Sequence, residues 1–285
     1  MTGISGAAKL AGVIGWPIKH SLSPALHGYW LQSLNIDGAY VPLAVEPANL
    51  EVAVRTLPNL GFAGANVTVP HKEAVRAFID HETETTTRIG AVNTLICNED
   101  GTITGDNTDA FGFISHLYDA APSWSPLLGT AVVLGAGGAA RAVIDALQQA
   151  GVSQILVTNR TQEKAQALAD HFGVGVHVVP WPERSDALND AMLLVNTTTL
   201  GMTGKPSLDI TLNGLASDAV VYDIVYAPLL TDLLKAAAER GLTTVDGLGM
   251  LLHQARPGFA AWFGTLPEVT GALREHVLEV LRSRG

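Results

Sequence analysis

The chain has 285 residues, of which 47% are hydrophobic and only 15% charged. This composition supplies a sizeable core and excludes a largely disordered protein, while the length favours two domains. Lys and Arg number 17 against 27 Asp and Glu, so the net charge of −10 argues against a general nucleic-acid binder, which needs a basic face. A small anionic ligand stays possible, because a few cations can dominate one local surface.

The cysteine content and the apolar segments of the sequence indicate the cellular compartment of the protein. Cys97 is the only cysteine, so no intrachain disulfide can form, which fits a reducing cytoplasm. Residues 1–8 carry no apolar run typical of a signal peptide, and residues 120–140 contain too much proline and glycine for a membrane helix. The nine histidines are scattered without metal-ligand spacing. We therefore expect a cytoplasmic protein with no membrane association and no metal.

Strand-like and helix-like segments alternate along the first half. The predicted strands are 11–15, 39–45 and 64–69, and the predicted helices are 23–34, 48–57, 71–79 and 109–118. Ser23 is expected to cap its helix ahead of Pro24. Segments 93–97 and 102–104 flank a turn and predict a hairpin. This alternation favours an α/β fold with parallel sheets covered by helices.

A second α/β run follows residues 121–129, whose proline and glycine content predicts a connector between domains. The predicted strands of this run are 130–134, 154–158, 174–179, 192–196, 220–224 and 243–245. The predicted helices are 139–150, 161–172 and 231–240, and the tail is expected to form helices at 251–263 and 267–282.

A glycine-rich turn opens this second run. Gly135-Ala136-Gly137-Gly138-Ala139-Ala140 follows an apolar strand, begins a helix and fits the pattern G-x-G-x-x-A. Gly135 allows a tight turn, Gly137 lets the backbone approach a pyrophosphate, and Ala140 lets helix and strand pack closely. Free N–H groups at the helix start then bind phosphate. The turn predicts a dinucleotide-binding site.

The end of the next strand distinguishes NADP from NAD. NAD sites usually carry an acidic residue there, bonded to the ribose 2′-hydroxyl. This chain has Asn159, Arg160 and Thr161, followed by Lys164. A guanidinium pairs with a phosphate through two hydrogen bonds, as a 2′-phosphate requires. The sequence therefore favours NADP.

Three polar stretches in the first half suit a ligand with several hydroxyl groups. They are residues 20–24, 66–72 and 93–94 with 106–109, all rich in Ser, Thr and Asn. Ligands of open α/β sheets bind outside the strand ends, where such side chains would exchange hydrogen bonds with hydroxyls. Lys72 is a cation at these strand ends, and Asp109 is its candidate partner.

Seven motifs together resemble the shikimate dehydrogenase family, which includes shikimate/quinate dehydrogenases. In chain order they read Gly-Trp-Pro-Ile-Lys-His-Ser-Leu-Ser-Pro, Gly-Ala-Asn-Val-Thr-Val-Pro-His-Lys, Gly-Ala-Val-Asn-Thr, Gly-Asp-Asn-Thr-Asp, Gly-Ala-Gly-Gly-Ala-Ala-Arg, Thr-Asn-Arg-Thr and Asp-Gly-Leu-Gly-Met-Leu. Order and spacing agree over nearly the whole chain. The resemblance implies an oxidoreductase that reversibly reduces 3-dehydroshikimate to shikimate with NADPH, in the chorismate pathway of aromatic amino-acid biosynthesis.

The resemblance also implies an architecture of two domains. The shikimate-binding catalytic domain would be discontinuous, comprising residues 1–110 and 248–285 around an open mixed, mainly parallel sheet. Residues 111–247 would form a Rossmann-type NADP-binding domain.

Roles carried over from the family fall on individual residues. In the substrate site, Ser21 and Ser23 would hold the carboxylate, and Lys72 with Asp109 would form the catalytic pair. The residues implied to contact the rest of the substrate are Thr68, Asn93, Asp109, Tyr226 and Gln254. The pyrophosphate would lie against Gly135, Ala136, Gly137, Gly138 and Ala139, and the 2′-phosphate against Asn159, Arg160, Thr161 and Lys164. The nicotinamide side would be lined by Thr197, Thr199, Ile224, Tyr226, Gly247 and Met250.

For the reaction, we expect Lys72 to exchange the proton with the substrate oxygen, while Asp109 orients Lys72 and substrate. Three alternatives stay open: an NAD-dependent quinate/shikimate dehydrogenase, a folate-type methylene dehydrogenase and a non-catalytic ligand sensor on the same fold. Paired serines at the carboxylate and Arg160 at the cofactor favour shikimate and NADP. A small-molecule substrate is the expected partner, and monomer and homodimer are both open.

Overall fold

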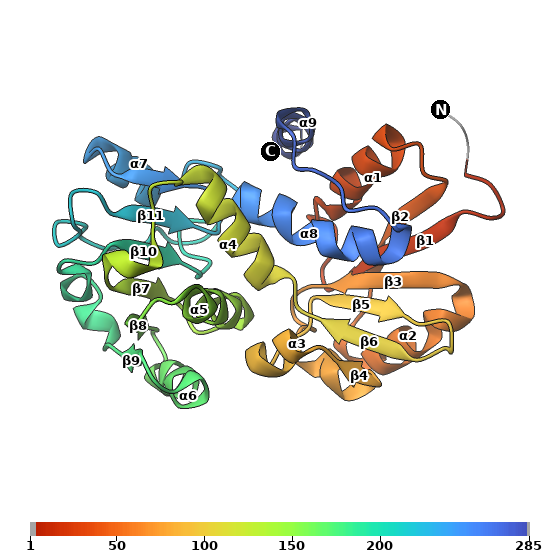
Figure 1. The fold of residues 1–285 in the computed structure, drawn as a ribbon, viewed down its shortest axis with the longest axis horizontal. Coiled ribbons are helices and arrows are strands. Elements are labelled where there is room, and N and C mark those ends of the chain that lie inside the picture. Colours follow the sequence, from red (N-terminus) through yellow and green to blue (C-terminus); the bar gives the residue numbers. More distant parts are fainter. Residues whose placement is uncertain (1–3, 284–285) are drawn as a thin grey trace. The chain divides into compact units, whose positions relative to one another are not determined.

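The computed structural model describes residues 4–283, and the chain forms two compact units (Figure 1). The first unit comprises Met1–Thr108 and Gln254–Gly285, and the second comprises Asp109–His253. The last helices thus return to the first unit, and the long helix α8 (Gly247–Phe263) carries the chain across that boundary. No helix among residues 4–283 is long and apolar enough to cross a membrane.

A mixed, mainly parallel sheet forms the first unit, with the strand order β2-β1-β3-β5-β6-β4. The strands are β1 (Lys9–Gly15), β2 (Gly38–Ala44), β3 (Phe62–Val67), β4 (His81–Glu82), β5 (Thr94–Cys97) and β6 (Ile103–Asp106). Strand β1 pairs in parallel with β2 and β3, whereas β5 runs antiparallel to β3 and β6. The predicted hairpin is therefore confirmed.

The second unit has an entirely parallel sheet in the order β12-β11-β10-β7-β8-β9. Its strands are β7 (Ala131–Leu134), β8 (Ile155–Thr158), β9 (Val176–Val178), β10 (Leu193–Asn196), β11 (Val220–Asp223) and β12 (Thr243–Val245). The order reverses between β7 and β10, the point at which doubly wound sheets bind their ligands. The Rossmann-type arrangement is confirmed.

Helices cover both sheets and end close to the predicted residues. Those wholly within the first unit are α1 (Ser23–Ser33), α2 (Leu50–Thr56), α3 (Glu84–Ile89) and α9 (Gly271–Arg282), and those wholly within the second are α4 (Asp109–Ala120), α5 (Gly138–Ala150), α6 (Gln162–Phe172) and α7 (Asp232–Glu239). In the first unit, aromatic rings from α1, β2 and α8 form one buried cluster, in which His27 stacks on Tyr40 between Phe259 and Trp262.

Residues 71–79 do not form the predicted α-helix. Only Ala74–Phe78 is helical, as a short 3₁₀ helix. The carbonyl of Lys72, which an α-helix would bond to the N–H of Arg76, instead accepts the N–H of Val92 at 2.8 Å. A tertiary hydrogen bond has replaced a local one at this position.

Two further predictions are wrong. Residues 121–129 lie inside the second unit rather than between units, because Ala121 and Trp124 are buried there despite the surrounding prolines. Ser23 is the first residue of α1, not its cap; Leu22 occupies the cap position and no side chain caps the helix. Pro24 does lie in the first turn, as predicted.

Close packing between β3, β5 and α8 gives a first test. A Cβ at Gly64 would meet the Leu95 carbonyl oxygen and the indole nitrogen of Trp262, two atoms that share a 2.9 Å hydrogen bond. Gly64→Ala should lower the free energy of unfolding by about 3 kcal/mol, because strand and helix must move apart and break that bond. Urea denaturation measures the change.

Gly28→Ala is the matched control, since Gly28 lies within α1 and a Cβ there would meet nothing within 4 Å. Its expected effect is a gain of up to about 1 kcal/mol. Equal unfolding midpoints for the two variants would contradict the packing described.

Candidate functional site

The carboxamide of Asn93 lies at the centre of the polar side chains of the first unit. Asn93 directly precedes β5 and is 2% exposed. Its Oδ1 accepts three hydrogen bonds: from the Thr108 N–H at 2.8 Å, from Thr94 Oγ1 at 2.9 Å and from Thr108 Oγ1 at 3.1 Å. Its Nδ2 donates to Gln254 Oε1 at 3.3 Å. The amide orientation is therefore fixed, and two predicted substrate residues, Asn93 and Gln254, lie in contact.

Tyr40, to which the sequence analysis assigned no role, and Asn66, the first residue of the polar stretch 66–72, extend this network. Tyr40 donates through its hydroxyl to Asn66 Oδ1 at 2.6 Å. Asn66 Nδ2 then donates to the Asn93 carbonyl at 3.1 Å and to Thr94 Oγ1 at 3.2 Å. Burial raises the pKa of Tyr40 well above its ordinary value, so the hydroxyl stays protonated as a donor. The available signal was an asparagine inside an otherwise apolar strand.

The segment 91–93 anchors the backbone of Lys72 and the residues that precede Asp109. The Val92 N–H donates to the Lys72 carbonyl at 2.8 Å, and the Asn93 N–H donates to the Asp106 carbonyl at 3.0 Å. Asn107 Nδ2 donates to the Ala91 carbonyl at 2.9 Å. Because residues 106–108 lead directly into Asp109, the backbone of Lys72 and the approach to Asp109 are tied to the same three residues. Lys72 is half-buried, and Asp109 is buried.

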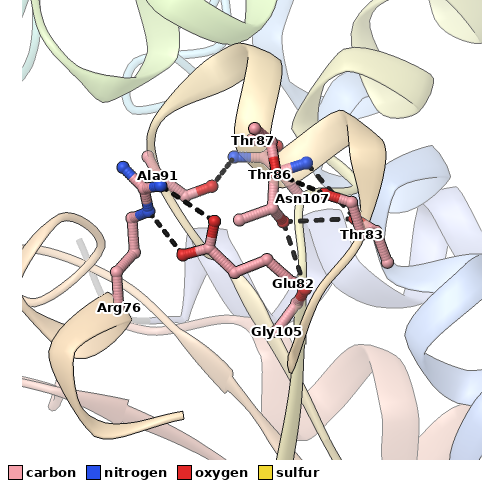
Figure 2. A network of polar contacts seen from close by, with 8 residues as sticks. All are labelled: Arg76, Glu82, Thr83, Thr86, Thr87, Ala91, Gly105 and Asn107. Carbon is pink, nitrogen blue, oxygen red and sulfur yellow. Dashed lines mark hydrogen bonds and ion pairs between the residues drawn. The ribbon is translucent and has the colours of Figure 1, made fainter. Parts of the chain in front are cut away.

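A second network beside residues 105–107 joins side chains of the 3₁₀ helix Ala74–Phe78, of β4 and of the start of α3 (Figure 2). Arg76 and Glu82 form a two-pronged ion pair, with Nε to Oε1 at 2.7 Å and Nη2 to Oε2 at 2.8 Å. Thr83 Oγ1 donates to Asp106 Oδ1 at 2.6 Å, and Thr86 Oγ1 donates to the Gly105 carbonyl at 3.2 Å. The guanidinium of Arg76 holds the pKa of Glu82 below its ordinary value.

Strand topology brings the remaining polar residues of the first unit to one sheet edge. Strands β1 and β3 are parallel, with Ile14 opposite Val67, so both chains leave the sheet at the same end. Residues 16–21 follow β1 and residues 68–72 follow β3, while the antiparallel β5 begins at that end, after Asn93. Ser21 Oγ accepts the N–H of the buried Ser23 at 3.3 Å. Hydroxyls, amides and the ammonium groups of Lys19 and Lys72 thus come from segments at one edge, a set that suits a ligand with several hydroxyls.

In the second unit, the glycine turn lies at the reversal point of the sheet. Gly135 follows β7 with φ +111°, and a Cβ there would lie 2.6 Å from Thr197 Oγ1. That hydroxyl donates to the Leu134 carbonyl at 2.7 Å, which joins the turn to the end of β10. Gly137 occupies the cap position of α5 without a side-chain bond, and a Cβ on Gly137 would meet nothing within 4 Å. The backbone at the helix start is left open to a phosphate, so this turn fits a dinucleotide.

The other predicted cofactor residues lie on neighbouring strand ends of the second unit. Asn159 follows β8 and donates through Nδ2 to the Thr161 carbonyl at 2.8 Å. Arg160, Thr161 and Lys164 are exposed at the start of α6. A Cβ on Gly247 would meet the backbone of Ile224, which shows that α8 begins against the end of β11. Met250 is buried on the same helix, Tyr226 is half-buried, and Gly138 and Ala139 begin α5.

No group of three or more His, Cys, Asp or Glu among residues 4–283 could hold a metal ion.

Comparisons with known proteins agree over most of the chain. The family model described as shikimate dehydrogenase substrate binding domain matches residues 13–95, and that described as shikimate / quinate 5-dehydrogenase matches residues 127–202. The shikimate dehydrogenase (NADP(+)) of Paramagnetospirillum magneticum is 58% identical over 96% of this chain and 100% of its own length. That of Rhodospirillum rubrum is 57% identical over 96% of this chain and 99% of its own.

Solved structures give the same picture. Shikimate 5-dehydrogenase from Thermus thermophilus, in complex with NADP(H) and shikimate, has a TM-score of 0.84 at 37% identity and covers 96% of this chain and 99% of its own. Quinate dehydrogenase from Corynebacterium glutamicum, in complex with NAD, has a TM-score of 0.88 at 34% identity, with 95% and 99% covered.

The Arg76–Glu82 pair predicts a pH-dependent contribution to stability. Glu82→Gln should lower the free energy of unfolding at pH 7 by about 1 kcal/mol, a small value because the two side chains are 36% and 23% exposed. The folded-state pKa of Glu82 is depressed, so its stabilisation is complete above the unfolded-state value of about 4.3 and is lost as pH falls through the folded-state value. Urea unfolding of both proteins at pH 7 and in acid tests this.

Glu99→Gln, in the exposed hairpin turn, is the control and should leave stability unchanged at both pH values. A loss in Glu82→Gln that is equally large in acid would show that the charge pair is not its source.

Proposed function

The chain belongs to the shikimate dehydrogenase family, and on that premise we propose that it reduces 3-dehydroshikimate to shikimate with NADPH, with Lys72 as acid–base residue and Asp109 as its partner. The observation that supports these roles is the shared anchoring of Lys72 and of residues 106–108 on the segment 91–93. The reverse reaction oxidises shikimate with NADP.

When bound, NADPH supplies the hydride that reaches the ketone carbon. The Lys72 ammonium hydrogen-bonds to the ketone oxygen and gives it a proton as negative charge develops there. In the reverse direction the neutral Lys72 amine takes the hydroxyl proton. Asp109 accepts hydrogen bonds from Lys72 and from a substrate hydroxyl, which orients both.

Substrate recognition rests on hydroxyls and amides of the first unit. Ser21 and Ser23 bind the substrate carboxylate through their hydroxyls. Thr68, Asn93 and Gln254 form hydrogen bonds with the ring hydroxyls, and Tyr226 also contacts the substrate. Because protein donors already occupy Asn93 Oδ1, this side chain offers a substrate hydroxyl only its N–H. An analogue without that hydroxyl would lose the hydrogen bond from Asn93 Nδ2, which disfavours its binding.

The second unit is the proposed NADP-binding domain. The pyrophosphate rests on Gly135, Ala136, Gly137, Gly138 and Ala139, and the 2′-phosphate pairs with Asn159, Arg160, Thr161 and Lys164. The nicotinamide end meets Thr197, Thr199, Ile224, Tyr226, Gly247 and Met250. The single cysteine, Cys97, fits a reducing compartment and supports a cytoplasmic location, with the protein either a monomer or a homodimer.

The likeness to a quinate dehydrogenase makes NAD-dependent oxidation of quinate the second candidate. Quinate carries an extra hydroxyl on the carbon that bears the carboxylate. The two serines proposed for that carboxylate, and the cations Arg160 and Lys164 in place of an acidic residue, favour shikimate and NADP.

Lys72→Met tests the acid–base role. We expect kcat for shikimate oxidation to fall by about 10²–10⁴-fold, because proton transfer is lost, with KM for shikimate changed only a few-fold. Nicotinamide absorbance under steady-state conditions gives both constants. Lys9→Met, which changes an exposed lysine at the opposite end of β1, should behave as the parent protein. A Lys72→Met protein that keeps its kcat and changes only KM would exclude the role.

Arg160→Ser tests cofactor choice. Loss of the charge-assisted hydrogen bonds to the 2′-phosphate should reduce kcat/KM for NADP+ by about 10–100-fold and leave that for NAD+ nearly unchanged. The ratio of the two constants is the measured quantity. Lys205→Ser, an exposed cation of the same unit, is the control. If NADP+ and NAD+ lose efficiency equally, Arg160 does not read the 2′-phosphate.

A further inference from the structure

A buried carboxylate at the end of β11 has no role in the proposed function. Asp223 is 0% exposed, and its hydrogen-bond partners are all neutral. Oδ1 accepts from Asn196 Nδ2 at 2.9 Å and from the Val225 N–H at 3.0 Å, while Oδ2 accepts from Thr231 Oγ1 at 2.7 Å. The sequence signal was an acid within the apolar run that forms this strand.

Asn196, opposite Asp223 in the β10–β11 ladder, extends these contacts into the next loop (Figure 1). Its Oδ1 accepts from the Thr198 N–H at 3.0 Å and from Thr198 Oγ1 at 2.7 Å. Its Nδ2 also donates to the Leu200 carbonyl at 3.2 Å. Asp223 orients the Asn196 amide, because its carboxylate can accept only from the nitrogen, and the amide oxygen must then face Thr198.

The residues held in this way alternate with those proposed to meet the nicotinamide. Thr198 stands between Thr197 and Thr199. Val225 stands between Ile224 and Tyr226. The carboxylate therefore fixes the backbone of both loops at the position from which the cofactor-facing side chains project.

Keeping a charge here opposes folding. Burial raises the pKa of Asp223 to about 6, above the ordinary value of 3.8, so at neutral pH the ionised form destabilises the folded state relative to the protonated one. A protonated acid or an asparagine could donate to Thr231 Oγ1 instead of accepting from it, whereas the carboxylate can only accept, at both of its oxygens. The carboxylate therefore fixes the direction of every hydrogen bond that it makes, including the orientation of the Asn196 amide.

We propose that Asp223 is a positioning residue for hydride transfer: it holds the loops 197–200 and 224–226 in the one arrangement that orients the nicotinamide end of the cofactor. This inference rests on the proposed function. Asp223 itself touches neither substrate nor cofactor, and acts through Asn196, Val225 and Thr231.

The test is Asp223→Asn in the full chain. We expect kcat for shikimate oxidation to fall about 10–100-fold, because small errors in the reacting geometry are costly, with KM for shikimate unchanged within about twofold. The deuterium isotope effect on kcat, measured with shikimate labelled at the transferred hydrogen, should rise as hydride transfer becomes rate-limiting. A purely structural residue would lower thermal stability without altering that isotope effect.

Matched variants separate these outcomes. Thr231→Val and Thr198→Val each remove one hydroxyl of the network. Both should lower kcat and raise the isotope effect, by smaller factors than Asp223→Asn does. If Asp223→Asn does not fold, these two variants provide the test. Asp209→Asn, whose side chain is at the surface, should change nothing. Folded network variants with parental kcat and isotope effect would overturn the inference while the proposed function stands. A parent protein without turnover of shikimate and NADP+ would overturn both.

Discussion

A buried amide oxygen that receives three hydrogen bonds is the constraint on which the first unit depends. Asn93 Oδ1 cannot be left unpaired in the interior, and the donors that satisfy it come from the start of β5 and from the segment after β6. The same residue donates through its backbone to Asp106 and through its side chain to Gln254. Strands, loop and helix α8 thus meet at one side chain, and a displacement of any of them disturbs the others.

The two units apply the same physical solution to different sheets. Each sheet is apolar in its interior and ends in a polar side chain that fixes loops: Asn93 in the first unit and Asp223 with Asn196 in the second. Hydrophobic packing has no direction, so it cannot set the orientation of a loop that leaves a strand. Buried hydrogen bonds do set that orientation, because leaving a buried donor or acceptor unpaired costs free energy. Apolar packing of the strands therefore stabilises the fold, while the buried hydrogen bonds at the strand ends fix the orientation of the loops.

Local patterns predicted the elements that local physics determines. The strand–helix alternation, the hairpin and the Gly135 turn could be predicted from the sequence, because periodicity and glycine conformation are properties of short segments. The helix at 71–79 was wrong because the Lys72 carbonyl bonds to Val92, twenty residues away in the chain. The roles of Tyr40 and Asp223 were missed for the same reason, since their partners belong to other strands. The glycine turn, Arg160 and Lys72 were found from local patterns at strand ends. The roles of the other proposed site residues came from family motifs, which the sequence alone could not place in space.

The loss of helix at Lys72 is itself informative about how such a site is built. In an α-helix, a side chain is placed by its own turn, and its orientation relative to other strands depends on how the helix packs. Here the backbone of Lys72 is bonded to the residue before Asn93, and the approach to Asp109 is bonded to the residues on either side of Val92. The proposed proton donor, its partner and a hydroxyl-binding amide therefore share one support. If Asn93 binds a substrate hydroxyl and Lys72 transfers the proton, as proposed, the two cannot be adjusted independently, and recognition of the ring hydroxyls and alignment for reaction become the same geometric requirement.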